Sequence, residues 1–224
     1  YEDLTNYKLA DGIGAGGWGG FTINALVGEE WGLARGRGFT YDDAGNVVIG
    51  TNGAYVLDTN KDLGSILPDF QGGLLNTFSI GNFTVNAMID FQAGGKFFSV
   101  TKMFNAYSGL GEDTVGDNAL GNPVRDPVVN ASGEVVAEGY ILRSNAGANS
   151  GGVLVEGVST SGEPLSVLVD AVSYYGRLFG THERWLYDAS YVKLRELSVG
   201  YTLPKAKLGN LPIQSINFSV IARN

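Results

Sequence analysis

The chain has 224 residues, 44% of them hydrophobic, and its 15 basic and 23 acidic side chains give it a formal net charge of −8. That charge opposes nucleic-acid binding, because proteins that bind nucleic acids normally present a basic surface to the phosphates. The absence of cysteine excludes disulfides and thiolate metal sites, and a single histidine excludes a multi-histidine zinc site within this chain.

Glycine and aromatic residues indicate the fold class. With 34 glycines, 11% aromatic residues and few stretches of helical periodicity, the sequence favours an all-β protein with many turns. No stretch approaches the roughly 20 consecutive apolar residues of a spanning helix, but a transmembrane barrel strand needs only about 9 to 11 residues of alternating character. Tyr1 is followed by an acidic pair, so this stretch lacks the basic start and apolar region of a signal peptide.

The first segment, residues 1–20, holds six glycines close to Trp18. Such a composition resists regular structure and predicts a loop. The following residues 21–27, FTINALV, alternate imperfectly between apolar and polar side chains, and a short strand is expected there.

Residues 29–59 are interpreted as a long loop that contains a small hairpin. In that hairpin, 39–41 is expected to pair near 47–49 across the turn Asp-Asp-Ala-Gly-Asn at 42–46. The turn lacks the alternating oxygen ligands and the distal glutamate of a calcium loop. It therefore predicts a chain reversal and no metal site.

Residues 74–92 predict a hairpin whose two faces differ in polarity. The strands meet at Gly81-Asn82, a dipeptide typical of tight turns. In the second strand the alternation is nearly regular: one face is wholly apolar, and the other carries Asn86, Asp90 and Gln92. The apolar face could meet the core of a soluble sandwich or the lipid around a transmembrane barrel, and periodicity alone does not separate the two.

The segment 99–186 is rich in glycine and proline, and an irregular insertion is expected there. Two local hairpins are predicted inside it. One pairs 128–129 with 135–136, and the other pairs 153–158 with 165–172.

A long strand is expected over 187–204, ending at Pro204, which removes a donor from the ladder. Its apolar residues change parity at Arg195 and Glu196, which indicates either a β-bulge or the emergence of the strand from an apolar layer. A turn over 205–212 and a further strand from Ile213 to the last residue follow.

Two blocks of sequence carry a family resemblance. Residues 64–95 read GSILPDFQGGLLNTFSIGNFTVNAMIDFQAGG, and residues 191–204 read YVKLRELSVGYTLP. In this order they resemble the SusC/RagA family of TonB-linked outer-membrane transporters. The stretch 152–164, GVLVEGVSTSGEP, followed by Tyr174 and Tyr175, is similar to an extracellular loop of that family.

The resemblance implies a fold and a location. The chain is expected to be an antiparallel transmembrane β-barrel segment with long extracellular loops and short periplasmic turns, in the outer membrane of a Gram-negative cell. Four strands cannot close a barrel, for which about eight is the minimum. Residues 1–224 are thus expected to be part of the C-terminal half of a large plugged TonB-dependent receptor-type barrel, without its plug domain and final strands.

The resemblance also implies a function: energised import of oligosaccharides or peptides, with a SusD-like surface lipoprotein as lid. The TonB complex would act through a plug segment that this sequence does not contain. On this interpretation lipid contacts the apolar strand faces, and Asn86, Asp90 and Gln92 face the lumen. No nucleic-acid partner and no cofactor is expected.

Aromatic side chains in loops are the candidates for ligand or partner contact, because aromatic faces stack on sugar rings and pack on protein partners. The candidates are Trp31, Tyr41, Tyr55, Tyr174, Tyr175 and Trp185. Packing between loops is the more common role for such residues, and placement at a membrane interface is another role for Trp185.

No catalytic site is expected. His182 neighbours Glu183 and Arg184 but has no identifiable nucleophile partner, and it is interpreted as a surface residue. The glycines of 35–38, Arg-Gly-Arg-Gly, lack the strand-to-helix context of a phosphate loop. The chain is therefore predicted not to be an enzyme.

Two alternatives to the importer stay open at this point. The first is a soluble all-β sandwich module that binds glycans and buries its apolar strand faces in a core. The second is a barrel piece with a structural role and no transport. Dependence on detergent distinguishes the importer from the soluble module, and substrate-dependent uptake distinguishes it from the structural piece.

Overall fold

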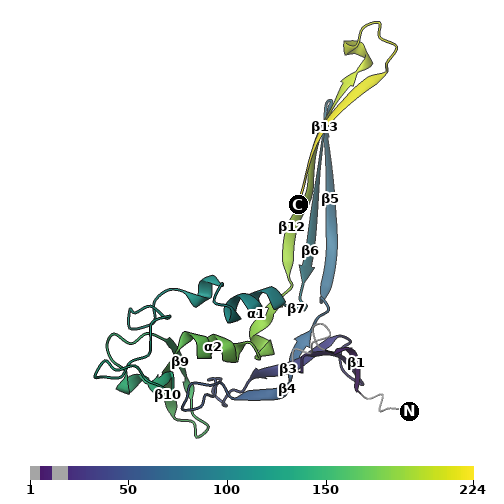
Figure 1. Ribbon diagram of the computed structural model, residues 1–224. Helices are drawn as coiled ribbons and strands as arrows, with labels where there is room; N and C mark the ends of the chain where they lie inside the picture. The colour runs from purple at the N-terminus through teal and green to yellow at the C-terminus, as the bar shows by residue number, and fades with distance from the viewer. Residues whose placement is uncertain (1–5, 12–19) are drawn as a thin grey trace. The chain divides into compact units, whose positions relative to one another are not determined.

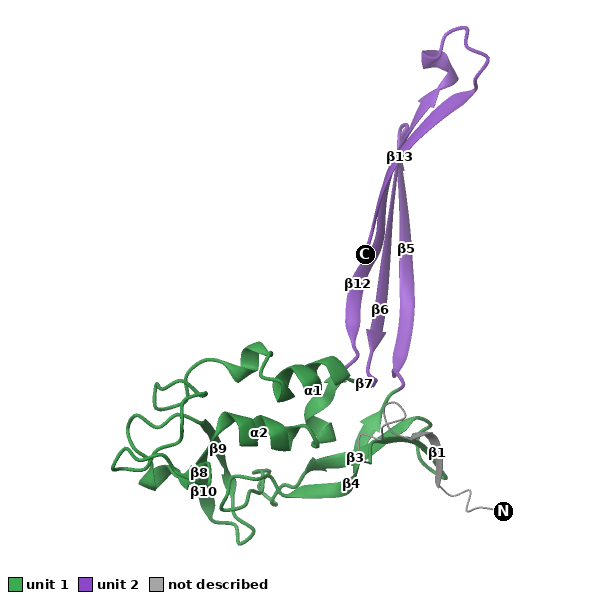
Figure 2. Ribbon diagram, in the orientation of Figure 1, with its two compact units in different colours: residues 1–66, 97–187 green, residues 67–96, 188–224 purple. Residues whose placement is uncertain are grey.

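The computed structural model describes residues 6–11 and 20–224, with side chains from residue 20 onward. The loop predicted around Trp18 lies outside the described residues. The chain divides into two compact units (Figure 1, Figure 2). The first unit takes 1–66 and 97–187, and the second takes 67–96 and 188–224.

The second unit is one antiparallel sheet of four strands in the order β13-β12-β6-β5. Its strands are β5 (Phe70–Ile80), β6 (Phe83–Ala93), β12 (Tyr191–Pro204) and β13 (Ser215–Arg223). The hairpin predicted at Gly81-Asn82 is confirmed, since Ile80 pairs with Phe83 and Gly81 takes the left-handed conformation at φ 59°.

Both short connections of this sheet lie at the same end. The β5–β6 turn is there, and so is the link from β12 to β13, which includes the 3₁₀ turn η4 (Lys205–Lys207). At the opposite end the chain leaves for the first unit. The predicted asymmetry between short turns and long excursions is therefore present in this sheet.

Of the two interpretations of the parity change in β12, the β-bulge is confirmed, at Arg195. Leu194 pairs with Ile89 and Glu196 pairs with Met88, so Arg195 is the extra residue. Because one residue is inserted, the apolar side chains on both sides of it face the same surface of the sheet despite their opposite parity. The bulge keeps the apolar face continuous.

The first unit contains a four-stranded sheet of order β1-β2-β3-β4. Its strands are β1 (Asn6–Asp11), β2 (Thr22–Leu26), β3 (Leu33–Phe39) and β4 (Leu57–Ser65). The strand expected over 21–27 is confirmed as β2. The predictions of loops over 1–20 and 29–59 are wrong at β1, β3 and β4, where the structure has strands.

In the described residues, the rest of the first unit is a three-stranded sheet, two helices and three 3₁₀ turns, with the pair β7–β11 where the chain passes between units. These elements are β7 (Lys96–Phe98), α1 (Val100–Tyr107), η1 (Glu112–Thr114), β8 (Tyr140–Leu142), η2 (Arg143–Asn145), β9 (Val153–Val158), β10 (Pro164–Val169), α2 (Ala171–Leu178), η3 (His182–Trp185) and β11 (Leu186–Asp188).

Both helices fall in the segment predicted to be irregular, and that prediction is wrong for them. Each begins with a side-chain cap: Ser99 Oγ accepts from the Lys102 N–H at 3.3 Å, and Asp170 Oδ1 accepts from the Ser173 N–H at 3.0 Å. At eight residues each, neither would be stable alone in water. They are stabilised by packing on each other and on Trp185 of η3, through the buried residues Met103, Ala106, Tyr175 and Leu178.

Among the described residues, two further clusters belong to the core of the first unit. One joins the three-stranded sheet to the neighbouring hairpins through Ile49, Val155, Val167 and Val169. The other lies on the four-stranded sheet and consists of Phe21, Ala34 and Leu63. The first unit thus buries apolar side chains from many separate segments.

A five-residue turn recurs in the first unit and accounts for part of the glycine content. In each copy the first N–H donates to the fifth carbonyl, and the fourth residue is a glycine with φ between 70° and 87°. This is the reversal of a short hairpin, and only glycine adopts its left-handed position freely. The copies span 42–46, 50–54, 118–122, 130–134 and 159–163. The hairpins predicted at three of these places are confirmed.

Candidate functional site

One surface of the four-stranded sheet is almost wholly apolar. Residues paired across neighbouring antiparallel strands point to the same side, so the register assigns each side chain to a surface. We call this surface the apolar face. It consists of Phe70, Leu74, Phe78, Ile80, Phe83, Val85, Ala87, Ile89, Phe91, Ala93, Val192, Leu194, Leu197, Val199, Tyr201, Leu203, Ile216, Phe218, Val220 and Ala222, interrupted by Gly72 and Asn76.

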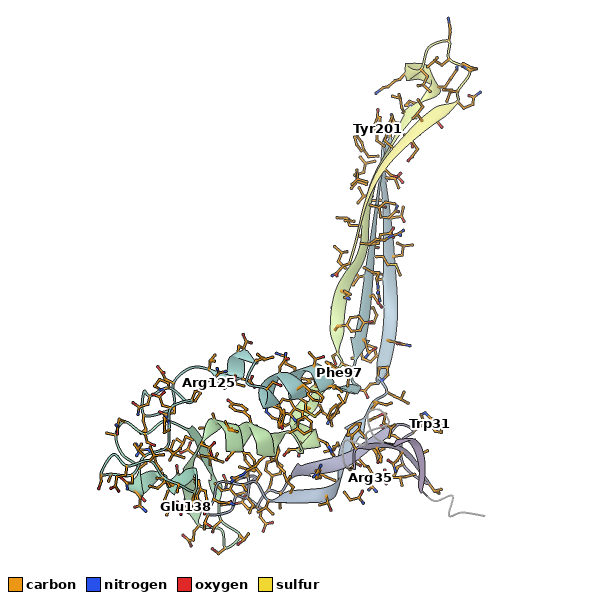
Figure 3. The ribbon with its side chains drawn as sticks, in the orientation of Figure 1. Trp31, Arg35, Phe97, Arg125, Glu138 and Tyr201 are labelled. Atoms are coloured by element: carbon orange, nitrogen blue, oxygen red, sulfur yellow. The ribbon has the colours of Figure 1, made fainter. Side chains whose placement is uncertain are left out.

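Aromatic rings gather toward both ends of the apolar face. At one end the rings of Phe70 and Phe91 lie 6.3 Å apart, and at the other those of Phe83 and Tyr201 lie 4.7 Å apart. Tyr201 is labelled in Figure 3. From Phe83 to Phe91 the strand is roughly 27 Å long at about 3.4 Å per residue. Mostly aliphatic side chains fill the distance between the two aromatic ends.

No element of the second unit covers the apolar face. All residues of this unit are described, and only Ser198 and Leu208 among them are buried. None of the three clusters of buried apolar residues lies in this unit. Ile80 is 76% exposed and Val192 81%. A contiguous apolar surface of this size on a single-layered sheet marks an interaction surface.

The opposite surface, which we call the polar face, carries the three residues predicted to face a lumen. Asn86 Oδ1 accepts from Thr77 Oγ1 at 2.8 Å, and Asn86 Nδ2 donates to Ser198 Oγ at 3.0 Å. Asp90 accepts from Tyr191 at 3.2 Å and forms an ion pair with Arg195. The shared surface of Asn86, Asp90 and Gln92 is confirmed by the register; that it lines a lumen stays a prediction.

No protein-family model matches the chain. Over 174 residues, 77% of the chain, the sequence is 25% identical to the TonB-dependent receptor P3 of Formosa agariphila. The chain is similar to a TonB-dependent receptor. It spans 13% of the length of that relative, so the similarity concerns a limited part of a much longer protein.

The similarity to a TonB-dependent receptor agrees with the sheet of the second unit. The chain is largely β, its sheets are antiparallel, and none of them closes on itself in the described residues. No described helix combines the length and apolar character that crossing a membrane requires.

The six aromatic candidates for ligand or partner contact divide into two groups. Trp31 is 60% exposed and Tyr41 is 46% exposed, and Lys61 lies over the Tyr41 ring at 4.6 Å. The other four candidates, Tyr55, Tyr174, Tyr175 and Trp185, belong to the helical cluster or pack against it.

Hydrogen bonds help to hold these four aromatic side chains in place. Trp185 is 1% exposed, and its Nε1 donates to the Leu178 carbonyl at 2.9 Å. The hydroxyls of Tyr55 and Tyr174 lie 3.4 Å apart, and the Tyr175 hydroxyl donates to the Asp113 carbonyl. Burial is the main cause that raises the pKa of both Tyr55 and Tyr175. In this structure these rings pack against one another and present little surface to a ligand.

His182 is not a surface residue, contrary to the prediction. It is 1% exposed, and its Nδ1 accepts from the backbone N–H of Arg37 at 2.9 Å. Glu183 Oε2 accepts from the Phe39 N–H at 2.7 Å and pairs with Lys61 at 2.9 Å. These contacts attach η3 to strand β3, so His182 and Glu183 have a structural role here.

The glycines of the Arg-Gly-Arg-Gly pattern at 35–38 lie at the same contact between β3 and η3. A Cβ atom at Gly36 would lie 2.5 Å from His182 Nδ1, and one at Gly38 would lie 2.6 Å from Glu183 Oε2. Both glycines therefore allow η3 to approach the strand closely. Among the described residues no group of three or more His, Cys, Asp or Glu side chains could hold a metal ion.

Proposed function

We propose that this chain is a membrane-spanning part of an outer-membrane importer of the SusC type. The importer takes up oligosaccharides or peptides by TonB-dependent transport, together with a SusD-like surface lipoprotein. One observation carries the proposal: the second unit is a single-layered sheet with a continuous, uncovered apolar face and a polar face behind it.

The dimensions of the sheet support a position in lipid. Its strands have 9 to 14 residues, and a tilted barrel strand needs about 9 to 11 to cross a bilayer. Outer-membrane barrels present to lipid an apolar band about 25 Å tall with an aromatic girdle at each border. The apolar face has this pattern along β6, with Phe83 near one end and Phe91 near the other.

The open edges of the sheet also support a larger barrel. Strands β5 and β13 each have one neighbour in this sheet, and their outer edges carry unpaired backbone groups. Such groups are too costly to leave unpaired in lipid, so further strands of the native protein must pair with them. The similarity to a TonB-dependent receptor supports TonB-coupled uptake. The substrate class and the lipoprotein lid are proposed from the SusC/RagA resemblance of the two sequence blocks.

The soluble sandwich is not favoured. A sandwich buries its apolar face against a second sheet at about 10 Å, whereas the second unit provides no such layer. A structural barrel piece without transport shares the sheet, and uptake assays distinguish it from an importer.

Fractionation of source cells is the first test. The polypeptide that contains YVKLRELSVGYTLP should be found in the outer membrane, at a mass several-fold larger than that of this chain, and should co-purify with a lipoprotein. A soluble protein of the size of this chain would overturn the proposal.

A matched pair of substitutions then tests which face meets lipid. Leu197 on the apolar face and Met88 on the polar face are both 39% exposed. In the native protein Leu197→Arg should reduce the amount of folded, heat-modifiable protein in the outer membrane, because arginine on the lipid face costs about 2–4 kcal/mol near the midplane. Met88→Arg should be tolerated, since Met88 pairs with Glu196 across the strands. Equal tolerance of both substitutions would contradict the orientation.

A further inference from the structure

A pocket in the first unit lies between the end of α1 and the start of α2. Its volume is about 370 Å³, which is within the range of roughly 300–1,000 Å³ typical of small-molecule sites. Its walls come from both helices, from η1 and from the loop at 125–127, and none of them is a strand. Neither the apolar face nor the attachment of η3 involves this pocket.

Arg125, labelled in Figure 3, lines the pocket and is held by three hydrogen bonds. Its Nε donates to the Thr114 carbonyl at 2.9 Å, and its Nη2 donates to Thr114 Oγ1 at 2.8 Å and to the Gly109 carbonyl. Among the described residues, no acceptor is bonded to Nη1. The guanidinium is therefore fixed in place with N–H groups left for a ligand oxygen.

Two carboxylates lie in the same pocket. Asp170 Oδ1 caps α2, and its other oxygen forms no hydrogen bond with the described residues. The Asp126 carboxylate accepts no hydrogen bond from the described part of the chain, and Asp126 is an exposed residue that lines the pocket. The residues that line the pocket thus include hydrogen-bond acceptors as well as the donors of Arg125.

Tyr107 adds a flat aromatic surface. Its side chain is 56% exposed, and Phe179 packs beside the ring with centroids 4.9 Å apart. An aromatic ring supported in this way offers a large contact area at a small loss of side-chain entropy.

Donors, acceptors and an aromatic ring in one pocket define the ligand chemistry. A pyranose has hydroxyls that both donate and accept, and a C–H surface that stacks on an aromatic ring. The two carboxylates outnumber the single arginine, and the chain carries a net charge of −8, so an anionic sugar is disfavoured. Peptide backbones are commonly held by an exposed strand edge, which this pocket lacks.

We propose that the pocket between α1 and α2 binds one neutral pyranose unit of an oligosaccharide, with its C–H face on Tyr107 and its hydroxyls bonded to Arg125 and Asp126. The inference rests on the proposed function, because it names the substrate class of the importer and one of the places where the substrate is held.

The test uses the native polypeptide that contains this chain, purified in detergent. Its binding is measured to immobilised neutral gluco-, galacto-, manno- and xylo-oligosaccharides, to sulfated oligosaccharides and to a tetrapeptide library. Tyr107→Ala and Asp126→Asn are the test variants. Phe97→Ala and Asp43→Asn are the matched controls, since they remove an exposed ring and a carboxylate elsewhere in the first unit. Thermal melting of all four variants checks that each is folded.

The expected result is binding of at least one neutral oligosaccharide, weakened about tenfold or more by each test variant and changed by less than about twofold by each control. Binding that is insensitive to the test variants overturns the site. Binding of sulfated sugars or peptides that is sensitive to them overturns the substrate class, and failure to bind any neutral sugar overturns the inference.

Failure of this inference is distinguishable from failure of the proposed function. If the protein lies in the outer membrane and imports a solute, but its sugar binding does not depend on Tyr107 or Asp126, only the proposed binding site is refuted. A protein found outside the outer membrane refutes the importer, whatever the pocket binds.

Discussion

Gly36 and Gly38 show how single residues determine the packing of the first unit. Both lie on β3 where η3 contacts the strand, and a side chain at either position would overlap the groups of His182 or Glu183 that accept hydrogen bonds from β3. The contact joins segments about 145 residues apart in the sequence. These glycines are therefore sites of close approach.

Gly36→Ala should destabilise the protein by about 1–3 kcal/mol, because its Cβ would overlap the buried His182 ring and force it to shift. Gly176→Ala is the matched control. Gly176 lies in α2, and a Cβ there meets nothing within 4 Å, so alanine should stabilise by up to about 1 kcal/mol. Thermal melting of both variants checks the prediction, and a fall of similar size in both melting temperatures would contradict it.

The Asp42 carboxyl should make the stability of the fold depend on pH. The pKa of its carboxyl lies below the ordinary value of 3.8, chiefly because the side chain and the N–H of Asn46 donate to it. A lowered pKa means that the group stabilises the fold fully above about pH 3.8 and that this contribution is lost as pH falls through the lower, folded-state pKa.

Asp42→Asn should therefore lower the melting temperature above pH 4, and the difference from the unmodified protein should shrink toward pH 2. The reason is that the protonated carboxyl and the amide are both neutral. Asp43→Asn removes a carboxylate from the same turn and is the control, because the side-chain hydrogen bonds of the turn go to Asp42; it should change the melting temperature little. A constant difference across this pH range would contradict the assignment.

At the scale of elements, the bulge in β12 decides which surface the apolar residues share. Val192 and Leu194 precede it, Leu197 and Val199 follow it, and the extra residue Arg195 brings both pairs to the apolar face. Without the inserted residue, the pairs would point to opposite surfaces. Arg195 itself bonds Asp90 on the polar face.

Deletion of Arg195 should therefore prevent assembly of the native protein in the outer membrane, because either Val192 and Leu194 or Leu197 and Val199 would move to the polar face. Arg195→Ala keeps the extra residue and should assemble, with loss of the Asp90 ion pair only. The shift in electrophoretic mobility of unheated against heated protein measures assembly. A deletion variant that assembles as well as Arg195→Ala would refute this role of the bulge.

At the scale of the whole molecule, the two units are stabilised in different ways. The first has three clusters of buried apolar residues, drawn from both sheets and both helices. The second has a hydrogen-bonded ladder and no apolar cluster of its own. The second unit must obtain its apolar stabilisation from outside, and the proposed source is lipid.

Hydrogen exchange of the native protein should reflect this difference. In detergent or lipid, the amides of β5, β6 and β12 and those of the first-unit core should all be protected. When detergent is diluted, protection should fall in the second unit and persist near Met103 and Val167, which are fully buried. Equal loss in both units would contradict separate stabilisation.

The alternation of apolar and polar residues predicts much of the second unit's sheet from the sequence alone. The hairpin at Gly81-Asn82, the bulge at Arg195 and three of the five-residue turns, at 42–46, 130–134 and 159–163, depend on neighbouring residues, and the sequence predicts them. The turns at 50–54 and 118–122 are not predicted. The polar grouping of Asn86, Asp90 and Gln92 follows from the same period of two.

Only the tertiary structure decided the rest. The sequence of β3 predicts a loop because of its glycines, whose role is to leave room for η3, a segment distant in the sequence. The two short helices form because they pack on each other. The burial of His182 and Trp185 follows from these long-range contacts, as does the pocket that brings Tyr107, Arg125 and Asp170 together. A sequence pattern reports the neighbours along the chain, whereas these features depend on neighbours that folding brings together.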